Sequence, residues 1–567
     1  MKKLNIRTLI VFLMLIFMTA FFTDYNSVCG DENKVNEYKV VGYYTAWSSY
    51  SGFTPDKLDA KKLTHINYAF ANIENNKVVL GYPDKDPSNF DKLNELKAIN
   101  PDLKILLSVG GWSWSGKFSD AAATEGSREI FAQSCAEIVT KYNIDGIDLD
   151  WEYPVSGGLP TNITRSSDKQ NFTLLLEAIR QKLDERGTAD DKHYLLSIAG
   201  GASNYYLNNI EPEKIQQYID YVNIMTYDIR GSWDTYTDFN SPLYSNTQSG
   251  PHYKWSVDDS VRSWKEGGFP KEKIVVGVPF YGYLFNGVKN DNNGLYQSFQ
   301  NAKALSFSTI GKYLNDYGYE RYYDAEALVP WLFNGSSFIS YDDEKSISIK
   351  ADYVKSNKLG GVMIWELSHD QDEVLLNALW TTLNTERINL LSNHWAEETV
   401  KYLSSLDIID NIDIFNPEAP VTRGEFAEYI TRTLKIEKQD LSDRNKFSDV
   451  STKNDMYDAI GSAVQSGIVR GYTDGTFRPD NYITRQEAMV MYSGAMDYAG
   501  IISADDNRIN NFNDRYEIAD WAYPYVRKVL SSEIFNGIDE TTISPSRTFK
   551  KAEAAAAIKN LLEKMEK

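Results

Sequence analysis

The sequence predicts an α/β fold, a (β/α)8 TIM barrel that is followed by an all-α-rich region of three repeats. Between residues 38 and about 370, short apolar runs alternate with helical patterns, as repeated strand and helix units do. Beyond residue 389 a similar four-residue motif occurs three times, which indicates an internal repeat. A chain of 567 residues is also too long for one compact core, so we expect several domains.

Eight apolar runs are the candidates for the barrel strands. They are residues 40–47, 63–70, 103–110, 146–153, 195–200, 221–228, 274–281 and 361–366. Between the fourth and fifth runs, five apolar residues lie at helical spacing and form one face, which we expect to cover the outside of the barrel. These are Phe172, Leu175, Leu176, Ile179 and Leu183.

The segment 282–342, between the seventh and eighth strands, is too long for a simple helical crossover and is rich in Tyr, Phe, Gly and Asn. It predicts a small α+β insertion beside the mouth of the barrel, where the loops of this fold carry function. We place the whole barrel domain at residues 38–383.

Residues 1–29 are predicted to be a signal peptide, because Lys2, Lys3 and Arg7 precede an apolar run that is too short for a membrane span. Cleavage after Cys29 or near Ala20 is left open. A lipid anchor on Cys29 is the less favoured alternative, since such sites prefer a small residue before the cysteine. We therefore expect an exported protein with no membrane span in its mature form.

The net charge and the cysteine and histidine content limit which binding partners and which catalytic groups we expect. Lys and Arg number 59 and Asp and Glu number 79, a net charge of −20, which would repel nucleic acid and anionic lipid and favours a neutral polymer. The mature chain would keep one cysteine, Cys135, at helical spacing with apolar residues, so we expect core packing rather than a catalytic thiol. The five histidines show no metal-ligand spacing, and we expect no metal and no cofactor.

The segment 145–154, DGIDLDWEYP, carries the pattern on which the functional prediction depends. In a barrel strand, side chains alternate between the helices outside and the interior. The outward set is Ile147, Leu149 and Trp151, and the inward set is Asp148, Asp150 and Glu152. Carboxylates this close cannot all stay ionised, so we predict shared protons, with Glu152 as a general acid at the C-terminal end of the strand. A structural or solvated acidic cluster is the alternative, and the perfect apolar alternation argues against it.

This segment resembles the D-x-x-D-x-D-x-E signature of glycoside hydrolase family 18. Three more segments are similar to motifs of the family: residues 107–113 at the end of the third strand, 225–228 at the end of the sixth, and Trp365 with Glu366 at the end of the eighth. The resemblance covers about residues 38–370. It implies retaining hydrolysis in which the substrate's own acetamido group is the nucleophile, an exception to the scheme with two carboxylates.

The resemblance also implies a role for each matched residue. Glu152 would protonate the glycosidic oxygen and later activate water, while Asp150 would turn from Asp148 toward the acetamido group and stabilise the oxazolinium ion. Tyr227 would donate a hydrogen bond to the same group, and Asp145, outside the alternating register, would be structural. The implied substrate-binding residues are Gly111, Trp112, Tyr153, Met225, Asp228 and Trp365.

Three more tryptophans, Trp47, Trp114 and Trp233, are candidates for further sugar subsites, because flat aromatic faces stack on pyranose rings. Packing within the barrel is the alternative for each of them. The sequence departs from the family pattern at Tyr283, where many members carry Arg, and this leaves the polar contacts of the neighbouring subsite open.

The C-terminal motif reads TRGE at residues 422–425, TRQE at 484–487 and KKAE at 550–553. The three repeats, at 389–436, 443–500 and 508–567, resemble S-layer homology domains, which hold bacterial exoproteins on a cell-wall polysaccharide. The resemblance implies that an anionic group of that polymer is bound by Arg423, Arg485 and Lys551. Lys551 keeps the positive charge but lacks the guanidinium, which can donate two parallel hydrogen bonds to a carboxylate. A capping box formed by the adjacent Thr and Glu is the alternative, and both can hold together.

The joint at residues 381–390 has no Pro-, Gly- or Ser-rich linker, so we expect the barrel to be held close to the wall. The leading hypothesis is a secreted chitinase that is attached non-covalently to the cell wall or S-layer and cleaves chitin or N-acetylglucosamine oligomers. The alternatives are a non-catalytic chitin lectin and an endo-β-N-acetylglucosaminidase that acts on N-glycans or peptidoglycan. The sequence leaves endo or exo action open.

Overall fold

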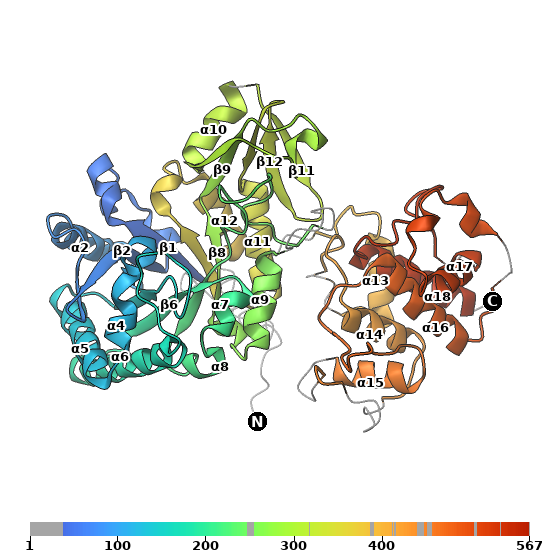
Figure 1. The fold of residues 1–567 in the computed structure, drawn as a ribbon, viewed down its shortest axis with the longest axis horizontal. Helices are drawn as coiled ribbons and strands as arrows, with labels where there is room; N and C mark the ends of the chain where they lie inside the picture. The colour runs from blue at the N-terminus through green and yellow to red at the C-terminus, as the bar shows by residue number, and fades with distance from the viewer. Residues whose placement is uncertain are drawn as a thin grey trace, which may run out of the picture.

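A computed structural model describes residues 38–246, 255–316, 318–385, 390–410, 412, 415–438, 447–450, 456–503, 507–532 and 535–565. The predicted signal peptide at 1–29 lies outside these residues. Figure 1 shows a barrel of strands and helices, a second sheet above it, and a helical C-terminal part at its side.

The predicted barrel is confirmed. Its eight parallel strands follow one another around the sheet, and β1 pairs with β2 to close it. They are β1 (Lys39–Thr45), β2 (His65–Glu74), β4 (Lys104–Gly110), β5 (Gly146–Asp150), β6 (Leu195–Gly201), β7 (Tyr221–Met225), β8 (Ile274–Pro279) and β14 (Gly361–Trp365). A further strand, β3 (Lys77–Leu80), pairs antiparallel with β2 and was not predicted.

Several predicted strand boundaries are wrong by a few residues, and the fourth strand matters most for the site. The fourth strand was expected to reach residue 153, whereas β5 ends at Asp150. The chain leaves the sheet there because the backbone N–H of Glu152 donates to the hydroxyl of Ser115 instead of to a neighbouring strand. The alternation still continues past the end of the strand: Trp151 is buried outside the barrel against Phe118 and Phe172.

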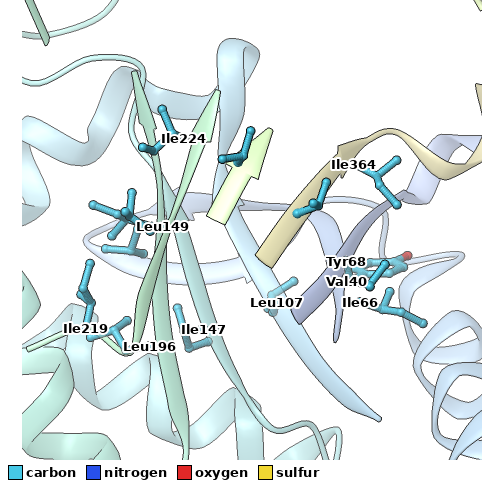
Figure 2. Packing of buried hydrophobic residues seen from close by; sticks show 14 of the residues in the cluster. Val40, Ile66, Tyr68, Leu107, Ile147, Leu149, Leu196, Ile219, Ile224 and Ile364 are labelled. Carbon is cyan, nitrogen blue, oxygen red and sulfur yellow. The ribbon is translucent and has the colours of Figure 1, made fainter. Parts of the chain in front are cut away.

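Helices surround the barrel and bury the outward side of the strands. The longer ones are α2 (Asp86–Glu95), α5 (Glu125–Lys141), α6 (Asp168–Asp190), α9 (Val257–Glu266), α11 (Glu344–Ser356) and α12 (Val374–Asn384). The five predicted apolar residues of α6 are all buried, and so is Cys135 on α5, which confirms its place in the core. Figure 2 shows strand side chains such as Ile66, Leu107 and Ile147 in this outer cluster. Each large apolar side chain buried there contributes about 1.5–3 kcal/mol.

The insertion predicted between the seventh and eighth strands is an α+β unit. Its antiparallel sheet has the order β10-β9-β13-β12-β11, with one helix, α10 (Phe307–Asp316). The strands are β9 (Tyr281–Asn286), β10 (Asn301–Ser306), β11 (Glu320–Asp324), β12 (Val329–Phe333) and β13 (Ser337–Ser340). Because β9 follows directly after β8, this sheet stands at the C-terminal end of the barrel strands.

The C-terminal part is helical and has its own apolar core. The helices described there are α13 (Glu397–Ser405), α14 (Arg423–Thr433), α15 (Tyr457–Gln465), α16 (Arg485–Tyr498), α17 (Tyr523–Ser531) and α18 (Lys551–Met565). Three short β-bridges join the repeats into a closed ring. They are Thr422 with Tyr482, Thr484 with Thr548, and Lys550 with Pro420.

Candidate active site

A cavity of ≈ 400 Å³ opens at the C-terminal ends of the barrel strands. We call the inward-facing acids Asp148, Asp150 and Glu152 the acidic file. Its outer members, Asp150 and Glu152, line the cavity together with Tyr227. Five other residues predicted from the motifs also line it: Trp112, Tyr153, Met225, Asp228 and Trp365. The four sequence motifs, which lie far apart in the chain, therefore meet in one place.

Asp148, the innermost acid, is completely buried and is held by four donors. Its carboxylate accepts hydrogen bonds from Tyr43 and Ser108 at 2.7 Å each, from Ser197 at 2.6 Å and from Asn223 at 3.3 Å. Burial raises the pKa of Asp148, and these four hydrogen bonds oppose the rise. A carboxylate with this many donors is stabilised in its ionised form, so we assign the negative charge of the file to Asp148.

Asp150 has the opposite environment. Its Oδ1 is buried and has no hydrogen-bond partner among the residues that the structure describes. Burial, the charge of Glu152 and the charge of Asp148 together raise the pKa of Asp150 well above its ordinary range. This environment favours the protonated form of Asp150. A protonated carboxyl that lines a cavity and lacks a partner is available to a polar group of a ligand.

Glu152, at the outer end, is poised to change its protonation near neutral pH. Burial raises the pKa of Glu152 to about 7; a hydrogen bond from Tyr153 opposes this rise, and the charge of Asp228 adds to it. A carboxyl group with such a pKa is protonated in mildly acidic solution and can give up its proton there.

Tyr227 and Asp228 follow the sixth barrel strand, β7, and line the cavity. The hydroxyl of Tyr227 lies 3.7 Å from the sulfur of Met363, a weak acceptor, so it can donate to a ligand. Asp228 accepts hydrogen bonds from Tyr281 at 2.5 Å and from Tyr283 at 2.8 Å. Tyr283, the position where the sequence departs from the family pattern, thus makes its polar contact with Asp228, a residue that lines the cavity.

The sequence analysis missed several contributors to this site, among them Tyr43 and Ser115. Tyr43 on β1 donates to Asp148, and its ring packs against Trp365 with centroids 5.4 Å apart. Ser115 accepts from the backbone of Glu152 at 2.8 Å and donates to the carbonyl of Asp150 at 3.0 Å. Ser115 lies two residues beyond the 107–113 motif, and that closeness was the available signal.

The tryptophans have different settings. Trp112, Trp233 and Trp47 are 51%, 59% and 40% exposed, so each presents a face to solvent. Trp233 packs against Tyr283, and Trp47 packs against Phe70 and Tyr82; neither tryptophan lines the cavity. Trp114 is half-buried against Tyr82 and does not line the cavity, an arrangement that fits the packing alternative.

The backbone conformation at Gly111 and its close contact with Phe70 favour glycine at this position. Its φ is +70°, and a Cβ there would lie 2.6 Å from the ring of Phe70. It does not line the cavity.

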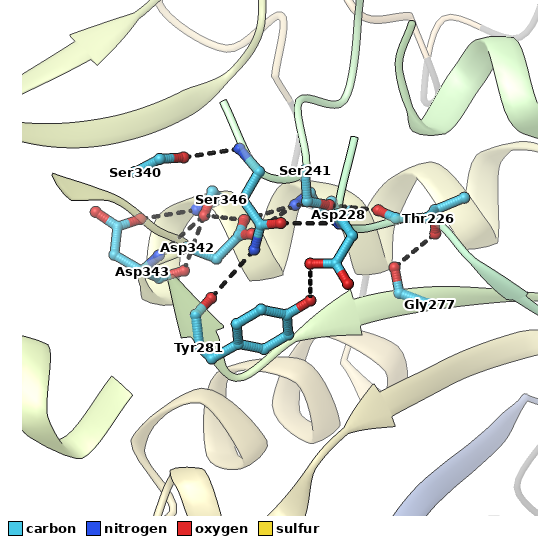
Figure 3. A network of polar contacts seen from close by, with 11 residues as sticks. Thr226, Asp228, Ser241, Gly277, Tyr281, Ser340, Asp342, Asp343 and Ser346 are labelled. Carbon is cyan, nitrogen blue, oxygen red and sulfur yellow. Dashed lines mark hydrogen bonds and ion pairs between the residues drawn. The ribbon is translucent and has the colours of Figure 1, made fainter. Parts of the chain in front are cut away.

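A buried polar network supports the loop that carries Tyr227 and Asp228 (Figure 3). Lys350 of α11 is fully buried, forms an ion pair with Asp342 at 2.7 Å and donates to Ser241 at 2.9 Å. The hydroxyl of Ser241 donates to the carbonyl of Thr226 at 2.7 Å. Helix α11 is thereby linked to the peptide that precedes Tyr227.

Within the part of the chain that the structure describes, no group of three or more His, Cys, Asp and Glu side chains is placed to hold a metal ion. None of the helices that the structure describes combines the length and the apolar character needed to cross a membrane.

The repeats place their predicted binding residues at helix starts. Thr422 and Thr484 form capping boxes with Glu425 and Glu487, so the capping alternative is confirmed. Arg423 is nearly buried between Tyr472 and Phe477 and donates to the carbonyl of Arg470 at 2.6 Å.

The other two repeats differ from the first. Arg485 donates to the carbonyls of Ile543 and Asn536 and lies 3.3 Å from Glu553. Lys551 forms an ion pair with Glu425 at 2.6 Å. The cation of the third repeat is therefore already neutralised by a carboxylate of the first.

Comparison with known proteins agrees with this geometry. Residues 39–370 match the family model "Glycosyl hydrolases family 18", and residues 391–427, 446–489 and 511–555 match "S-layer homology domain". Chitinase A1 of Niallia circulans is 41% identical over 412 residues, which is 62% of this chain and 59% of that protein. The chain thus spans less than two thirds of that relative's length.

Two solved structures are also similar. One is a glycoside hydrolase family 18 N-acetylglucosaminidase from Paenibacillus barengoltzii, with 44% identity and a TM-score of 0.57, covering 61% of this chain and 99% of that one. The other is chitinase ChiW from Paenibacillus sp. str. FPU-7, described as a cell-surface-expressed multi-modular enzyme, with 41% identity and a TM-score of 0.57, covering 61% of this chain and 43% of that one.

Proposed function

The chain belongs to glycosyl hydrolases family 18, and we propose that it is a cell-surface chitinase that cleaves β-1,4 bonds between N-acetylglucosamine units with retention of configuration. One observation carries the proposal. The partnerless carboxyl of Asp150, the hydroxyl of Tyr227 and the carboxyl of Glu152 line one cavity of ≈ 400 Å³.

In the first step Glu152, protonated below a pH of about 7, gives its proton to the glycosidic oxygen. The carbonyl oxygen of the substrate's acetamido group attacks the anomeric carbon as the leaving sugar departs. Asp150 accepts a hydrogen bond from the acetamido N–H and stabilises the oxazolinium ion, while Tyr227 donates to the acetamido oxygen. In the second step the Glu152 carboxylate takes a proton from water, which attacks the anomeric carbon and opens the ring.

The carboxyl groups of the cavity support this route over one with a protein nucleophile. Among the described residues that line it, the carboxyl groups are those of Asp150, Glu152 and Asp228. Asp228 is engaged by Tyr281 and Tyr283, and Asp150, whose pKa is raised well above its ordinary range, is a close neighbour of Glu152 in the sequence. The usual scheme instead requires an ionised carboxylate opposite the acid.

Rings at the rim support an extended sugar chain as the substrate. Trp365 stacks on Phe70 with centroids 5.8 Å apart and presents its other face to the cavity, where a sugar ring would lie. The exposed faces of Trp112, Trp233 and Trp47 would hold further units.

The proposal also covers the location of the enzyme. A signal peptide at residues 1–29 would export it, and the three S-layer homology domains would hold it on a secondary cell-wall polysaccharide. Arg423 and Arg485 would bind the anionic groups of that polymer, and Lys551 would contribute less because Glu425 already pairs with it.

Product analysis on colloidal chitin and on short N-acetylglucosamine oligomers tests this function, with Glu152→Gln as the matched inactive variant. We expect soluble oligomers from the native chain and a rate about 10²–10⁴ lower for Glu152→Gln. Oligomers of unacetylated glucosamine should not be cleaved, because they lack the internal nucleophile. Binding of chitin without cleavage would instead establish the lectin, and cleavage of glycoproteins or peptidoglycan alone would establish the other hydrolase.

The likeness to an N-acetylglucosaminidase along 99% of its chain supports a second candidate, the release of single N-acetylglucosamine units from chain ends. The same time course separates the two. A monomer as the first product on long oligomers indicates the exo reaction, and a ladder of longer products indicates the chitinase.

A further inference from the structure

The second repeat differs from the other two at the position that faces the barrel. In the ring of bridges, Pro420, Tyr482 and Thr548 hold equivalent places, each two residues before the recurring motif. Only at Tyr482 does this position carry an aromatic side chain, and its ring packs against the core cluster of the barrel.

Tyr482 contacts the carboxylate of Asp258, a barrel residue that also accepts a hydrogen bond from the barrel itself. Its hydroxyl donates to Asp258 on α9, and Tyr353 of α11 donates to the other oxygen of the same carboxylate at 2.8 Å. Burial raises the pKa of Asp258, and the charge of Arg262 opposes the rise. One buried carboxylate is thus shared between a tyrosine of the repeats and a tyrosine of the barrel.

Arg262 makes the second link. Its guanidinium lies over the ring of Tyr482, 4.7 Å from the centroid, and donates to the carbonyl of Asp480 in the same repeat. On α9, Arg262 and Asp258 are one turn apart. A cation over an aromatic ring gains most when both are shielded from water, as they are here.

Helix α9 therefore has two functional faces. Val257, Val261 and Trp264 are buried against the barrel, whereas Asp258 and Arg262 contact the second repeat. Apolar contact accompanies the polar one, because Ala419 of the first repeat is part of the core cluster of the barrel. The residues lining this junction and those lining the active-site cavity have no member in common, so docking leaves the cavity open.

We infer that this surface is a docking site between the repeats and the flank of the barrel, and that it makes the catalytic and anchoring parts move as one body. Domains of one chain move relative to each other unless a specific interface restrains them. The chain supports the restraint, because α12 ends at Asn384 and Leu390 already packs against the barrel cluster. The wall-bound enzyme would thus hold its cavity at a fixed angle to the wall.

Small-angle X-ray scattering and calorimetry on the full chain test this inference, with Tyr482→Ala and Arg262→Gln combined in one variant. The matched control is Thr548→Ala, which changes the equivalent position of the third repeat. We expect the native chain and the control to scatter as one compact particle. The double variant should show a larger radius of gyration, and its repeats should melt separately and a few degrees lower.

Hydrolysis of a short soluble oligomer and binding to isolated walls monitor the fold of each part in every variant. A double variant with the scattering of the native chain would overturn the inference, and so would a native chain that already scatters as a flexible ensemble. A double variant that lost hydrolysis or wall binding would be replaced by Tyr482→Phe, which removes only the hydroxyl and should give the same change to a smaller degree. Scattering and calorimetry are made on free protein, so a failure of the catalytic or wall-binding proposal would remove only the two folding checks and leave the test of docking in place.

Discussion

The hydroxyl of Ser115 lies 2.8 Å from the backbone nitrogen of Glu152 and accepts its hydrogen bond. The same hydroxyl donates to the carbonyls of Asp150 and Gly111, at 3.0 and 2.9 Å. A single buried serine thus joins the backbone of two acidic residues just where β5 ends. It positions Glu152 without touching the cavity.

Replacing this serine tests its positioning role. In Ser115→Ala the N–H of Glu152 loses its buried partner, a loss worth about 1–3 kcal/mol. We expect kcat to fall about tenfold, because Glu152 is no longer held in line with the glycosidic oxygen, while KM changes little. The control is Ser119→Ala, which removes a buried serine paired with Asp168. Equal losses of kcat in the two variants would reduce Ser115 to a purely structural residue.

The pH profile of kcat/KM should respond in opposite directions to two neighbours of Glu152. Because the protonated form is the active acid, activity falls as pH rises through about 7. Tyr153→Phe removes a hydrogen bond that lowers the pKa of Glu152, so the alkaline limb should move to higher pH. Asp228→Asn removes a negative charge that raises this pKa, so the limb should move to lower pH.

Shifts of the same sign in these two variants, or no shift in either, would contradict the assignment of the alkaline limb to Glu152. Tyr142→Phe, a tyrosine far from the cavity, serves as the control and should leave the profile in place.

The buried pair of Lys350 and Asp342 should behave as a coupled unit. Lys350→Met leaves a buried carboxylate unpaired and should lower the free energy of unfolding by about 3–5 kcal/mol. The double variant Lys350→Met with Asp342→Leu should recover most of this loss, because a well-packed apolar pair can replace a buried ion pair. Chemical unfolding measures the free energy of unfolding of the single and the double variant. The control is Lys312→Met, which replaces an exposed lysine and should keep this free energy within about 0.5 kcal/mol of that of the native chain. Additive losses would show that the two residues act independently.

Wall binding should depend unequally on the three repeats. Arg423 has no carboxylate partner among the ion pairs of the described residues, whereas Lys551 pairs with Glu425. We expect Arg423→Ala to weaken binding to isolated walls about tenfold. Arg423→Lys keeps the positive charge but loses the paired hydrogen bonds of the guanidinium, so its affinity should lie between those of Arg423→Ala and the native chain.

Lys551→Ala should change wall affinity less than about twofold. Arg432→Ala, which removes a surface arginine paired with Asp410 and Glu428, is the control for general charge loss. A loss at Lys551 equal to that at Arg423 would mean that the third repeat binds in spite of its ion pair.

Features that depend on local periodicity could be predicted from the sequence. The eight barrel strands and the apolar face of α6 follow from patterns within a few residues. The inward direction of Asp150 and Glu152 follows from alternation along one strand and continues even where the strand has ended. The capping boxes at Thr422 and Thr484 are local signals of the same kind.

Features that depend on contact between distant segments could not be predicted. Ser115 is 37 residues from Glu152, and Tyr43 is 105 residues from Asp148, so no window of sequence joins them. The same is true of Lys350 and Ser241, whose contact depends on how the inserted sheet meets the barrel. The unequal protonation of Asp148 and Asp150 likewise follows from four donors that only the fold brings to one of them.

The closed ring of repeats has a consequence for the order of events during synthesis. The bridge between Pro420 and Lys550 joins the beginning of the first repeat to the last helix of the third. Contacts between positions so distant in sequence form late, after the intervening chain has been made. A ribosome that stopped early would release a complete barrel with an open ring. The ring would close only after the segment that carries Lys550 had been made.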